Sequence, residues 1–533
     1  MELAQNLIQR INVADSLRRS AAARPAHPAL VDGERRWSYA ELDAWVDRLA
    51  AGLAARGYGR GDALALASGN SAEFLAVYYA AARLGVVCVP INLGWRPGEV
   101  AYVLGHSRAR GLVVESQLVA AMAEAIATSP DLADLQDLIV APGLGAQWEL
   151  APADRSRATL AEVELAGDTG PVEVVVGDRD PLSYLYTSGT TAFPKGVVGT
   201  HLGVYLESMS AALDNGWRAA DRFIAMMPMF HTAQLNAFCT PAVLAGATIH
   251  VHRGFEPERF LDTIEREQIT QVFGLPMMYR AALEHPTFPA RDLSSLRGAV
   301  YAMAPMPETQ IKACLDGFGC DFSLLFGQTE MSPITTLFRP EHQLTHVGAV
   351  GTPLTGVQVA IMDADGNLLP HGEQGEIVYR GPSTMQGYLR NPEATAEAFR
   401  HGWFHSGDVG RFGPDGVLWF VDRNKDVIKT GGENVASLEV ERAIYDADPK
   451  VAEAVVVGLP HARWSEAITA VVVAKPGETI DPEGLRTSLK SWLDGYKVPK
   501  SVIVVEELPR TSTGKIQKNV LREQYGTHYA SDS

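Results

Sequence analysis

The sequence predicts an α/β protein with a large N-terminal domain of α/β layers. Residues 36–115 alternate helical stretches with short apolar strands, ALALA at 63–67 and VVCVPI at 86–91. The same alternation recurs over 222–300, where FIAMMP, TIHVH, QVFGLP and GAVYAM are expected to be strands. Strands that alternate with helices are typical of a largely parallel sheet covered by helices. Ligands of such sheets bind near the ends of the strands.

After Gly348 the sequence pattern changes to short strands and turns, as in GEIVYRG and GVLWFVDR. This pattern predicts an antiparallel or β-barrel-like subdomain. A small α+β module follows, and a new turn unit begins directly after the strand that ends near Asp422. We therefore expect an N-terminal domain over 1–424 and a C-terminal domain over 425–533.

Composition restricts the function classes. The formal net charge of -17 argues against nonspecific nucleic-acid binding, which needs a broad basic face. Four cysteines with no CxxC pair are too sparse for a disulfide framework. The first residues lack the continuous apolar segment of a signal peptide, and no apolar run approaches the roughly 20 residues of a membrane span. We expect a cytoplasmic protein.

A hydroxyl- and glycine-rich loop, SYLYTSGTTAFPKG at 183–196, is typical of a phosphate cradle. Hydroxyls and backbone amides can donate to phosphate oxygens, and a lysine adds a mobile positive charge. A Walker A loop is excluded, because Pro194 precedes the lysine and Gly196 follows it. The expected phosphate ligands are Thr187, Ser188, Gly189, Thr190, Thr191 and Lys195.

This loop resembles the phosphate loop of the adenylate-forming superfamily, which includes acyl-CoA synthetases and nonribosomal adenylation domains. Six further motifs follow in the family's order and extend the resemblance over residues 30–520. It implies that a carboxylic acid attacks ATP to give an acyl-adenylate and pyrophosphate. A thiol such as CoA then displaces AMP. It also implies that the small C-terminal domain is mobile and rotates between the two steps.

The resemblance places several residues at the nucleotide. In LFGQTE (325–330), Phe326 would face adenine, Thr329 the α-phosphate and Glu330 a magnesium ion, which prefers one or two carboxylates plus phosphate oxygens. On its own, Glu330 would more often be a solvated glutamate at a helix start. The remaining positions implied at ATP or AMP are Ala304, Gly327, Asp408 and Arg423, with Asp408 at the ribose hydroxyls.

The motif AMMPMFHT (225–232) resembles the family segment beside the acyl group, and LPRTSTGKI (508–516) resembles the catalytic-lysine motif. The catalytic residues implied are Lys515, Thr329 and His231. His231 would gate and position the carboxylate, although a purely structural histidine stays open. The acyl pocket implied consists of Phe230, His231, Gln234, Phe273 and Met303, with Pro333 as a further candidate.

The loop KTGGEN (429–434) resembles the family segment that lines the acceptor tunnel, with Lys425 at the hinge. Lys429, Gly431 and Gly432 would border a pantetheine arm, while an ordinary β-turn is equally compatible. Two departures from the family pattern concern Met303 and Ser465, which stand where many relatives carry glycine. Met303 should intrude on the acyl pocket, or alternatively fill a gap in the core.

The motifs together indicate an ATP-dependent acyl-CoA ligase for a largely apolar monocarboxylic acid, using ATP, Mg²⁺ and CoA. Amino-acid adenylation is disfavoured, because the aromatic Phe230 is followed by His231 rather than by aspartate. An amide ligase with an amine or amino-acid acceptor remains an alternative. A nucleotide-binding regulator without chemistry is a third possibility, disfavoured by the presence of both Lys515 and Glu330.

Overall fold

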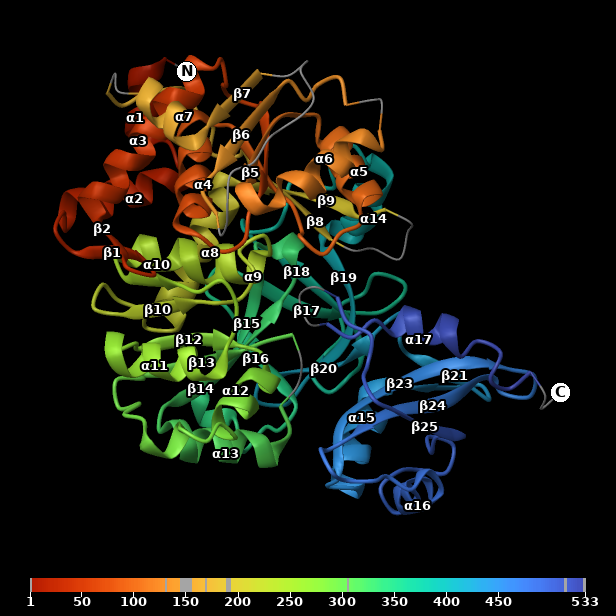
Figure 1. The fold of residues 1–533 in the computed structure, drawn as a ribbon. Coiled ribbons are helices and arrows are strands. Elements are labelled where there is room, and N and C mark those ends of the chain that lie inside the picture. The colour runs from red at the N-terminus through yellow and green to blue at the C-terminus, as the bar shows by residue number, and fades with distance from the viewer. Residues whose placement is uncertain are drawn as a thin grey trace.

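The computed structural model describes residues 2–129, 132–143, 156–167, 170–187, 193–303, 306–511 and 515–530. The chain forms a large N-terminal part and a smaller C-terminal part, drawn in blue in Figure 1. In the described residues the strands assemble into three sheets of seven, thirteen and five strands. None of the helices in these ranges combines the length and apolar character that a bilayer span requires.

The seven-stranded sheet is parallel except at β9, which pairs antiparallel with β8. Its strands, in spatial order, are β7 (Ser156–Thr159), β6 (Asp137–Ala141), β5 (Ala109–Glu115), β3 (Ala63–Ala67), β4 (Val87–Pro90), β8 (Pro181–Thr187) and β9 (Lys195–Thr200). The central strands β3 and β4 are buried along their whole length, as parallel strands covered on both faces must be.

The thirteen-stranded sheet joins a parallel half to an antiparallel half. Parallel pairing runs from β1 through β14, and antiparallel pairing takes over from β14 to β17. The order is β17 (Gln358–Met362), β18 (Gly375–Arg380), β19 (Phe404–Phe412), β20 (Leu418–Arg423), β16 (Ala349–Pro353), β15 (Ile334–Phe338), β14 (Asp321–Gly327), β13 (Gly298–Tyr301), β12 (Gln271–Gly274), β10 (Arg222–Ala225), β11 (Thr248–Val251), β1 (Pro28–Asp32) and β2 (Arg35–Ser38).

The expected parallel α/β layers are thereby confirmed. The barrel-like part of the expectation is not met, because β16 to β20 continue the large sheet as an open antiparallel edge and no recorded pairing closes them among the described residues. Alternating short strands and turns in a sequence indicate hairpins. They do not determine whether the first and last strands pair and close a barrel.

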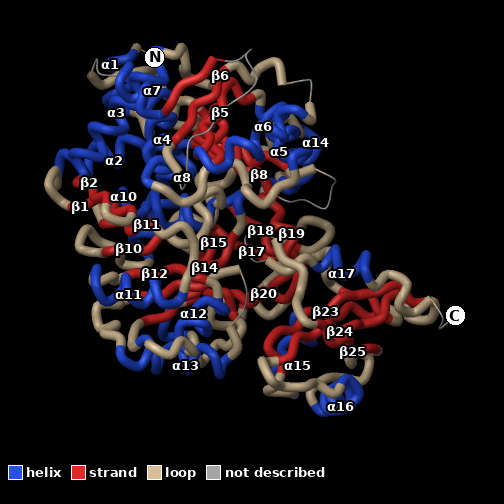
Figure 2. The backbone as a smooth tube through the Cα atoms, viewed as in Figure 1, coloured by secondary structure: helices blue, strands red, loops and turns tan. Residues whose placement is uncertain are grey.

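Helices α2, α4, α8 and α10 lie between the two large sheets (Figure 2). One hydrophobic core joins these helices to strands of both sheets, and α4 is buried at every position. Leu64 and Leu66 of β3 face this core, whereas Ala63, Ala65 and Ala67 face the core beneath α5 and α6. The helices of the large part are α1 (Leu3–Gln9), α2 (Val13–Ala23), α3 (Tyr39–Ala55), α4 (Ala72–Leu84), α5 (Pro97–Ser107), α6 (Val119–Ala127), α7 (Leu160–Ala166), α8 (His201–Asp214), α9 (Thr232–Gln234), α10 (Thr240–Ala245), α11 (Pro257–Glu267), α12 (Pro276–Leu283), α13 (Glu308–Phe318) and α14 (Pro392–Ala398).

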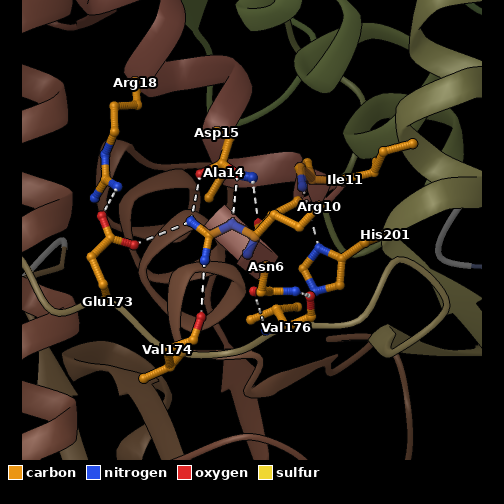
Figure 3. Close-up of polar contacts among 12 residues, drawn as sticks. Asn6, Arg10, Ile11, Ala14, Asp15, Arg18, Glu173, Val174, Val176 and His201 are labelled. Atoms are coloured by element: carbon orange, nitrogen blue, oxygen red, sulfur yellow. Dashed lines mark hydrogen bonds and ion pairs between the residues drawn. The ribbon is translucent and has the colours of Figure 1, made fainter. Parts of the chain in front are cut away.

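The start of α8 is anchored to the N-terminal segment (Figure 3). The Val13 amide donates to Nδ1 of His201 at 3.2 Å, and burial lowers the pKa of His201 to about 4, so the ring is a neutral acceptor. Arg10 binds Asp15 at 2.9 Å and donates to the Val174 carbonyl oxygen at 2.9 Å. The Val13–His201 bond holds the N-terminal end of α8, and the Arg10 contacts fix the segment before α2 against residue 174.

The small part contains the five-stranded sheet. Its strands are β21 (Ile428–Thr430), β22 (Glu433–Val435), β23 (Val451–His461), β24 (Ser465–Ala474) and β25 (Ser501–Val505), and its helices are α15 (Ser437–Ala447), α16 (Pro482–Ser488) and α17 (Lys518–Gln524). Hydrogen bonds between the two parts include those from Arg442 to the Gly348 carbonyl oxygen at 3.1 Å, from Arg280 to the Ala452 carbonyl oxygen at 3.5 Å and from the Ser437 hydroxyl to Asp422 at 2.7 Å.

Candidate active site

The predicted phosphate loop connects the antiparallel pair β8 and β9. Thr187 ends β8 and Lys195 begins β9, and the two residues are register partners. Ser188, Gly189, Thr190 and Thr191 lie outside the described residues. The ammonium of Lys195 stands 5.0 Å from the centre of the Tyr388 ring, a cation–π distance that fixes its direction. Lys195, where β9 begins, therefore lies beside Tyr388.

Glu330 lies on the other side of Tyr388. The Tyr388 hydroxyl donates to Oε1 of Glu330 at 2.9 Å, and the Met385 amide donates to the Glu330 carbonyl oxygen at 2.7 Å. Tyr388 thus connects the predicted phosphate lysine with the predicted magnesium ligand. No group of three His, Cys, Asp or Glu side chains in the described ranges could hold a metal ion. Glu330 with phosphate oxygens nevertheless fits the donor set that magnesium prefers.

The segment before Glu330 turns sharply at the end of β14. A Cβ atom added at Gly327 would lie 2.0 Å from the Pro333 carbonyl oxygen, so this close approach requires glycine. The Gln328 amide donates to that same oxygen at 2.9 Å. Phe326, whose ring centre lies 5.4 Å from that of Phe420, and Thr329 are both half-buried. The turn leaves partly accessible surface on the aromatic ring and the hydroxyl expected at adenine and at the α-phosphate.

Asp408 and Arg423 face each other across β19 and β20. They are register partners, with Arg423 Nε 3.4 Å from Asp408 Oδ1. Burial raises the pKa of Asp408 to about 6, although the charges of Arg423 and Lys515 oppose that rise and Glu330 adds to it. A desolvated carboxylate at this point can accept two neighbouring hydroxyl groups, such as those of a ribose.

Lys515 extends from the small part toward this strand pair. Its backbone is held by a hydrogen bond from the Thr511 amide to the Lys515 carbonyl oxygen at 2.8 Å. Its side chain retains accessible surface, yet the surrounding protein desolvates the ammonium and lowers its pKa to about 8. The positive charges of Arg423 and Lys425 lower it further, while Asp408 opposes them. The structure therefore brings the predicted catalytic lysine to the predicted nucleotide site.

His231 is the N-cap of α9. Its Nδ1 accepts a hydrogen bond from the Ala233 amide at 3.2 Å. Desolvation, with a smaller effect of the Lys515 charge, lowers the pKa of His231 to about 4. The ring is thus neutral at pH 7, and because Nδ1 is an acceptor the proton resides on Nε2. His231 offers an N–H donor, not a base, near the lysine.

The remaining acyl-pocket predictions differ in exposure. Phe230 is half-buried, whereas Phe273 is 1% exposed and its ring is stacked on Phe238 with centroids 4.4 Å apart. Gln234 is buried, and its Oε1 accepts from the Met227 amide at 3.0 Å. Met303 is 38% exposed. Ala304 lies outside the described residues. The acyl roles of these residues stay predictions.

Two residues of the site escaped the sequence analysis. Tyr388 reaches Lys195 because residues 386–389 pair with β9, as in the bond from the Leu389 amide to the Gly196 carbonyl oxygen at 2.7 Å. Glu376 accepts from the Gly407 amide at 3.0 Å and holds the turn before Asp408. Neither position carries a local motif, and both act through pairing between distant segments. The sequence did show a glycine turn before Asp408, and such a turn needs an acceptor for its amide, which Glu376 supplies.

The connection between the two parts passes through the predicted hinge. β20 ends at Arg423 in the large sheet, and β21 begins at Ile428 in the small one. Lys425 is exposed between them. Gly431 and Gly432 have φ of 61° and 91° and form the two-residue turn between β21 and β22. The β-turn interpretation of these glycines is confirmed, and their role at an acceptor tunnel stays a prediction.

Family models match both parts of the chain. The AMP-binding enzyme model covers residues 17–389. The chain belongs to the AMP-binding enzyme family. A second model, the AMP-binding enzyme C-terminal domain, covers residues 439–515 and so includes the predicted catalytic lysine. The resemblance to the adenylate-forming superfamily that the motifs indicated is thereby confirmed.

Known proteins resemble this AMP-binding enzyme over nearly its full length. The feruloyl-CoA synthase of Amycolatopsis sp is 36% identical over 95% of this chain and 98% of its own. The indoleacetate–CoA ligase of Aromatoleum aromaticum is 33% identical over 96% and 98%. The crystal structure of ATP-bound MatB from Rhodopseudomonas palustris is 29% identical, covers 98% of this chain and 100% of MatB, and superposes with a TM-score of 0.86.

Both departures from the family's glycines have left-handed backbone. Met303 has φ of 69° and Ser465 has φ of 66°, a region that a side chain with a Cβ enters at a cost of about 1 to 2 kcal/mol. Glycine in many relatives at these positions therefore has a backbone reason.

We expect Met303→Gly to shift the acid preference toward longer or bulkier acids. Each methylene gained or lost in an acyl pocket changes the barrier by about 1 to 3 kcal/mol, so relative kcat/KM should change about 5- to 150-fold. Ser465→Gly is the matched control, because it relieves the same backbone strain in the small part. A chain-length profile that keeps its shape in Met303→Gly while the melting temperature changes would assign Met303 to packing.

Proposed function

We propose that this enzyme activates a largely apolar monocarboxylic acid as its acyl-adenylate and then transfers the acyl group to CoA. The observation that carries the proposal is the convergence of Lys515 of the small part with Asp408 and Arg423 of the large part. A cation delivered beside a ribose-type carboxylate suits a reaction in which two anions must approach each other. The names of the relatives, a feruloyl-CoA synthase and an indoleacetate–CoA ligase, support transfer to CoA.

In the first step, an oxygen of the substrate carboxylate forms a bond to the α-phosphorus of ATP, and the bond from that phosphorus to the pyrophosphate oxygen breaks. Lys515 reduces the repulsion between the two anions, and His231 donates from Nε2 to orient the carboxylate. Lys195 and the hydroxyls of the phosphate loop bind the phosphates. Magnesium bound by Glu330 and phosphate oxygens would neutralise further negative charge.

The apolar character of the acid is inferred from the predicted pocket residues. Phe230, Phe273 and Met303 provide apolar surface, and none of the pocket candidates is an arginine that could bind a second carboxylate. The acyl groups in the names of the two relatives, feruloyl and indoleacetyl, each belong to an acid with a single carboxyl group and a ring. A monocarboxylic acid with an apolar body is therefore the substrate class that we favour.

The second step requires the acceptor thiol to reach the adenylate. We infer that the small domain, residues 425–533, turns about Lys425 and brings the hairpin with Lys429, Gly431 and Gly432 to the acyl carbon. The thiolate then forms the thioester bond as the bond to AMP breaks. The present arrangement, with Lys515 near Asp408, suits adenylation. In line with this, the TM-score is 0.86 against ATP-bound MatB and 0.77 against apo MatB.

An acid panel tests the proposed function. Pyrophosphate release is measured with ATP, magnesium and each acid, and products are then identified by mass after addition of CoA or of mixed amines. We expect acid-dependent pyrophosphate release with apolar monocarboxylic acids and a CoA thioester as product. Release that no acid stimulates would contradict adenylation, and an amide in place of a thioester would change the acceptor.

A further inference from the structure

Glu207 is a buried carboxylic acid for which no hydrogen bond is recorded among the described residues. It lies on α8 with 1% of its surface exposed, and neither carboxyl oxygen has a hydrogen-bond partner among the described residues. The backbone amide of Ile334 lies close enough to lower its pKa somewhat, although no hydrogen bond to either carboxyl oxygen is recorded. Burial raises the pKa of Glu207 well above its ordinary value and so favours the neutral acid. Buried polar groups in folded proteins are nearly always paired, so this exception requires a reason.

The surroundings of Glu207 connect it with the active site. α8 packs against β15, against α10 and against the π-helix Leu235–Cys239 that continues from His231 and α9. Ile334, the nearest backbone donor, begins β15 directly after the turn that carries Thr329 and Glu330. Two segments that bracket the predicted acyl site therefore pack against α8, and one of them, β15, begins beside the Glu207 carboxyl group.

Polar groups continue from His231 toward Glu207. Thr232 follows His231, and its Oγ1 accepts from Nδ2 of Asn236 at 3.1 Å. The Tyr78 hydroxyl donates to Oδ1 of Asn236 at 3.4 Å, and Tyr78 lies within electrostatic reach of Glu207. These groups are all buried, yet they satisfy one another and leave Glu207 out. Among the described residues, the Glu207 carboxyl group has free hydrogen-bonding capacity here, as do Nε2 of His201 at the start of α8 and the Tyr79 hydroxyl.

The π-helix gives a second, independent indication of a ligand. π-helical turns carry one residue more than an α-helix, cost stability and occur mostly at functional sites. Here the turn spans Leu235–Cys239, directly after the segment from Phe230 to Gln234 that the sequence assigned to the acyl group. A bound molecule would explain both features, because it could pair with the carboxyl group and make use of the irregular helix.

We propose that Glu207 is a specificity-determining residue that binds a hydroxyl or amino group at the far end of the acid substrate. This inference rests on the proposed function, and it refines the substrate class: the acid is apolar in its body but carries an O–H or N–H donor. A neutral carboxyl group can accept from a substrate hydroxyl and donate to it at the same time. An ammonium group would instead form an ion pair with the carboxylate.

The chemistry predicts a preference that can be measured. An acid without the distal group would leave Glu207 desolvated and unpaired in the complex, a cost that corresponds to about a 10- to 100-fold loss of kcat/KM. A methyl ether, which cannot donate, should lose part of the same preference. A structural role for Glu207 predicts no dependence on the distal group.

The test uses phenyl-substituted acids that differ only in the para substituent: hydrogen, hydroxyl, amino or methoxy. kcat/KM for acid-dependent pyrophosphate release is measured for the wild type, Glu207→Gln and Glu207→Leu. Ser208→Ala is the matched control on the same helix, because Ser208 is buried and bonds only the Thr240 hydroxyl at 2.8 Å among its recorded contacts. Removal of an unpaired carboxyl group in favour of leucine should preserve folding.

We expect the wild type and Ser208→Ala to favour the hydroxy or amino acid about 10- to 100-fold over the unsubstituted acid. Glu207→Leu should lose that preference and gain on the unsubstituted acid, while Glu207→Gln keeps part of it. The substituent that gives the higher kcat/KM, hydroxyl or amino, identifies the group that Glu207 binds. Ratios that are the same in wild type and both Glu207 variants would overturn the assignment and leave the proposed function standing. Absence of release with every acid would overturn the proposed function, and this inference with it.

Discussion

Lys515→Ala should reduce acid-dependent pyrophosphate release by two to three orders of magnitude. Loss of one preorganised positive group at a developing negative charge raises the barrier by about 3 to 4 kcal/mol. The same variant should still convert a supplied acyl-adenylate and CoA into thioester, because the lysine serves the first step alone in the proposed mechanism. Rapid-quench measurement of each half-reaction checks this division of labour.

Lys490→Ala is the control for the loss of one positive charge. Lys490 is exposed in the same domain and lies in the short 3₁₀ turn that follows α16. It should leave both half-reactions unchanged. Equal loss of both half-reactions in Lys515→Ala would contradict a role confined to adenylation. A lowered melting temperature that accompanies the loss would point to damage of the Thr511–Lys515 hydrogen bond instead.

The pH dependence of adenylation gives a separate prediction. Desolvation and the neighbouring cations lower the pKa of Lys515 to about 8 from its ordinary value near 10.5. The charged form is the active one, so kcat/KM for pyrophosphate release should fall as pH rises through about 8. Lys515→Arg should remove this fall, because guanidinium stays charged far above that pH. A fall that is identical in both proteins would assign the titration to another group.

The sequence indicated the parts of the candidate site that lie in local motifs. The strands of the parallel layers follow from buried apolar runs, and the phosphate loop was predicted from its hydroxyl and glycine residues, so both signals are local. Tyr388 could not be found in this way, because its contacts with Lys195 and Glu330 depend on pairing between segments far apart in the chain.

Glu207 illustrates a different limit. In the sequence it lies within an amphipathic-looking helix, where a glutamate is expected to face solvent. Only the arrangement of α8 between two large sheets buries it. The left-handed backbone of Met303 is likewise a property of the fold, although the glycine of many relatives at that position was a signal for it. Burial of a whole helix follows from sheet order, and sheet order is not encoded in any one segment.

Lys425→Pro should slow the second half-reaction and spare the first, whereas Lys515→Ala slows the first and spares the second. The segment from Arg423 to Ile428 is the covalent connection between the two sheets, and the Asp426 amide donates to the Arg423 carbonyl oxygen at 2.8 Å in the present arrangement. Rotation of the small domain requires the backbone here to change its dihedral angles. Proline fixes φ near -65° and also restricts the residue before it.

We expect the proline variant to form acyl-adenylate at close to the wild-type rate but to slow thioester formation tenfold or more, about 1.4 kcal/mol in the barrier. Enzyme-bound adenylate should then accumulate during a single turnover. The amounts of adenylate and of thioester in quenched samples measure this accumulation. Lys425→Ala keeps backbone freedom while it removes the charged side chain, so it should not accumulate adenylate. If Lys425→Pro turned over at the wild-type rate with no accumulated adenylate, the domain movement would have to pivot at another residue between Arg423 and Ile428.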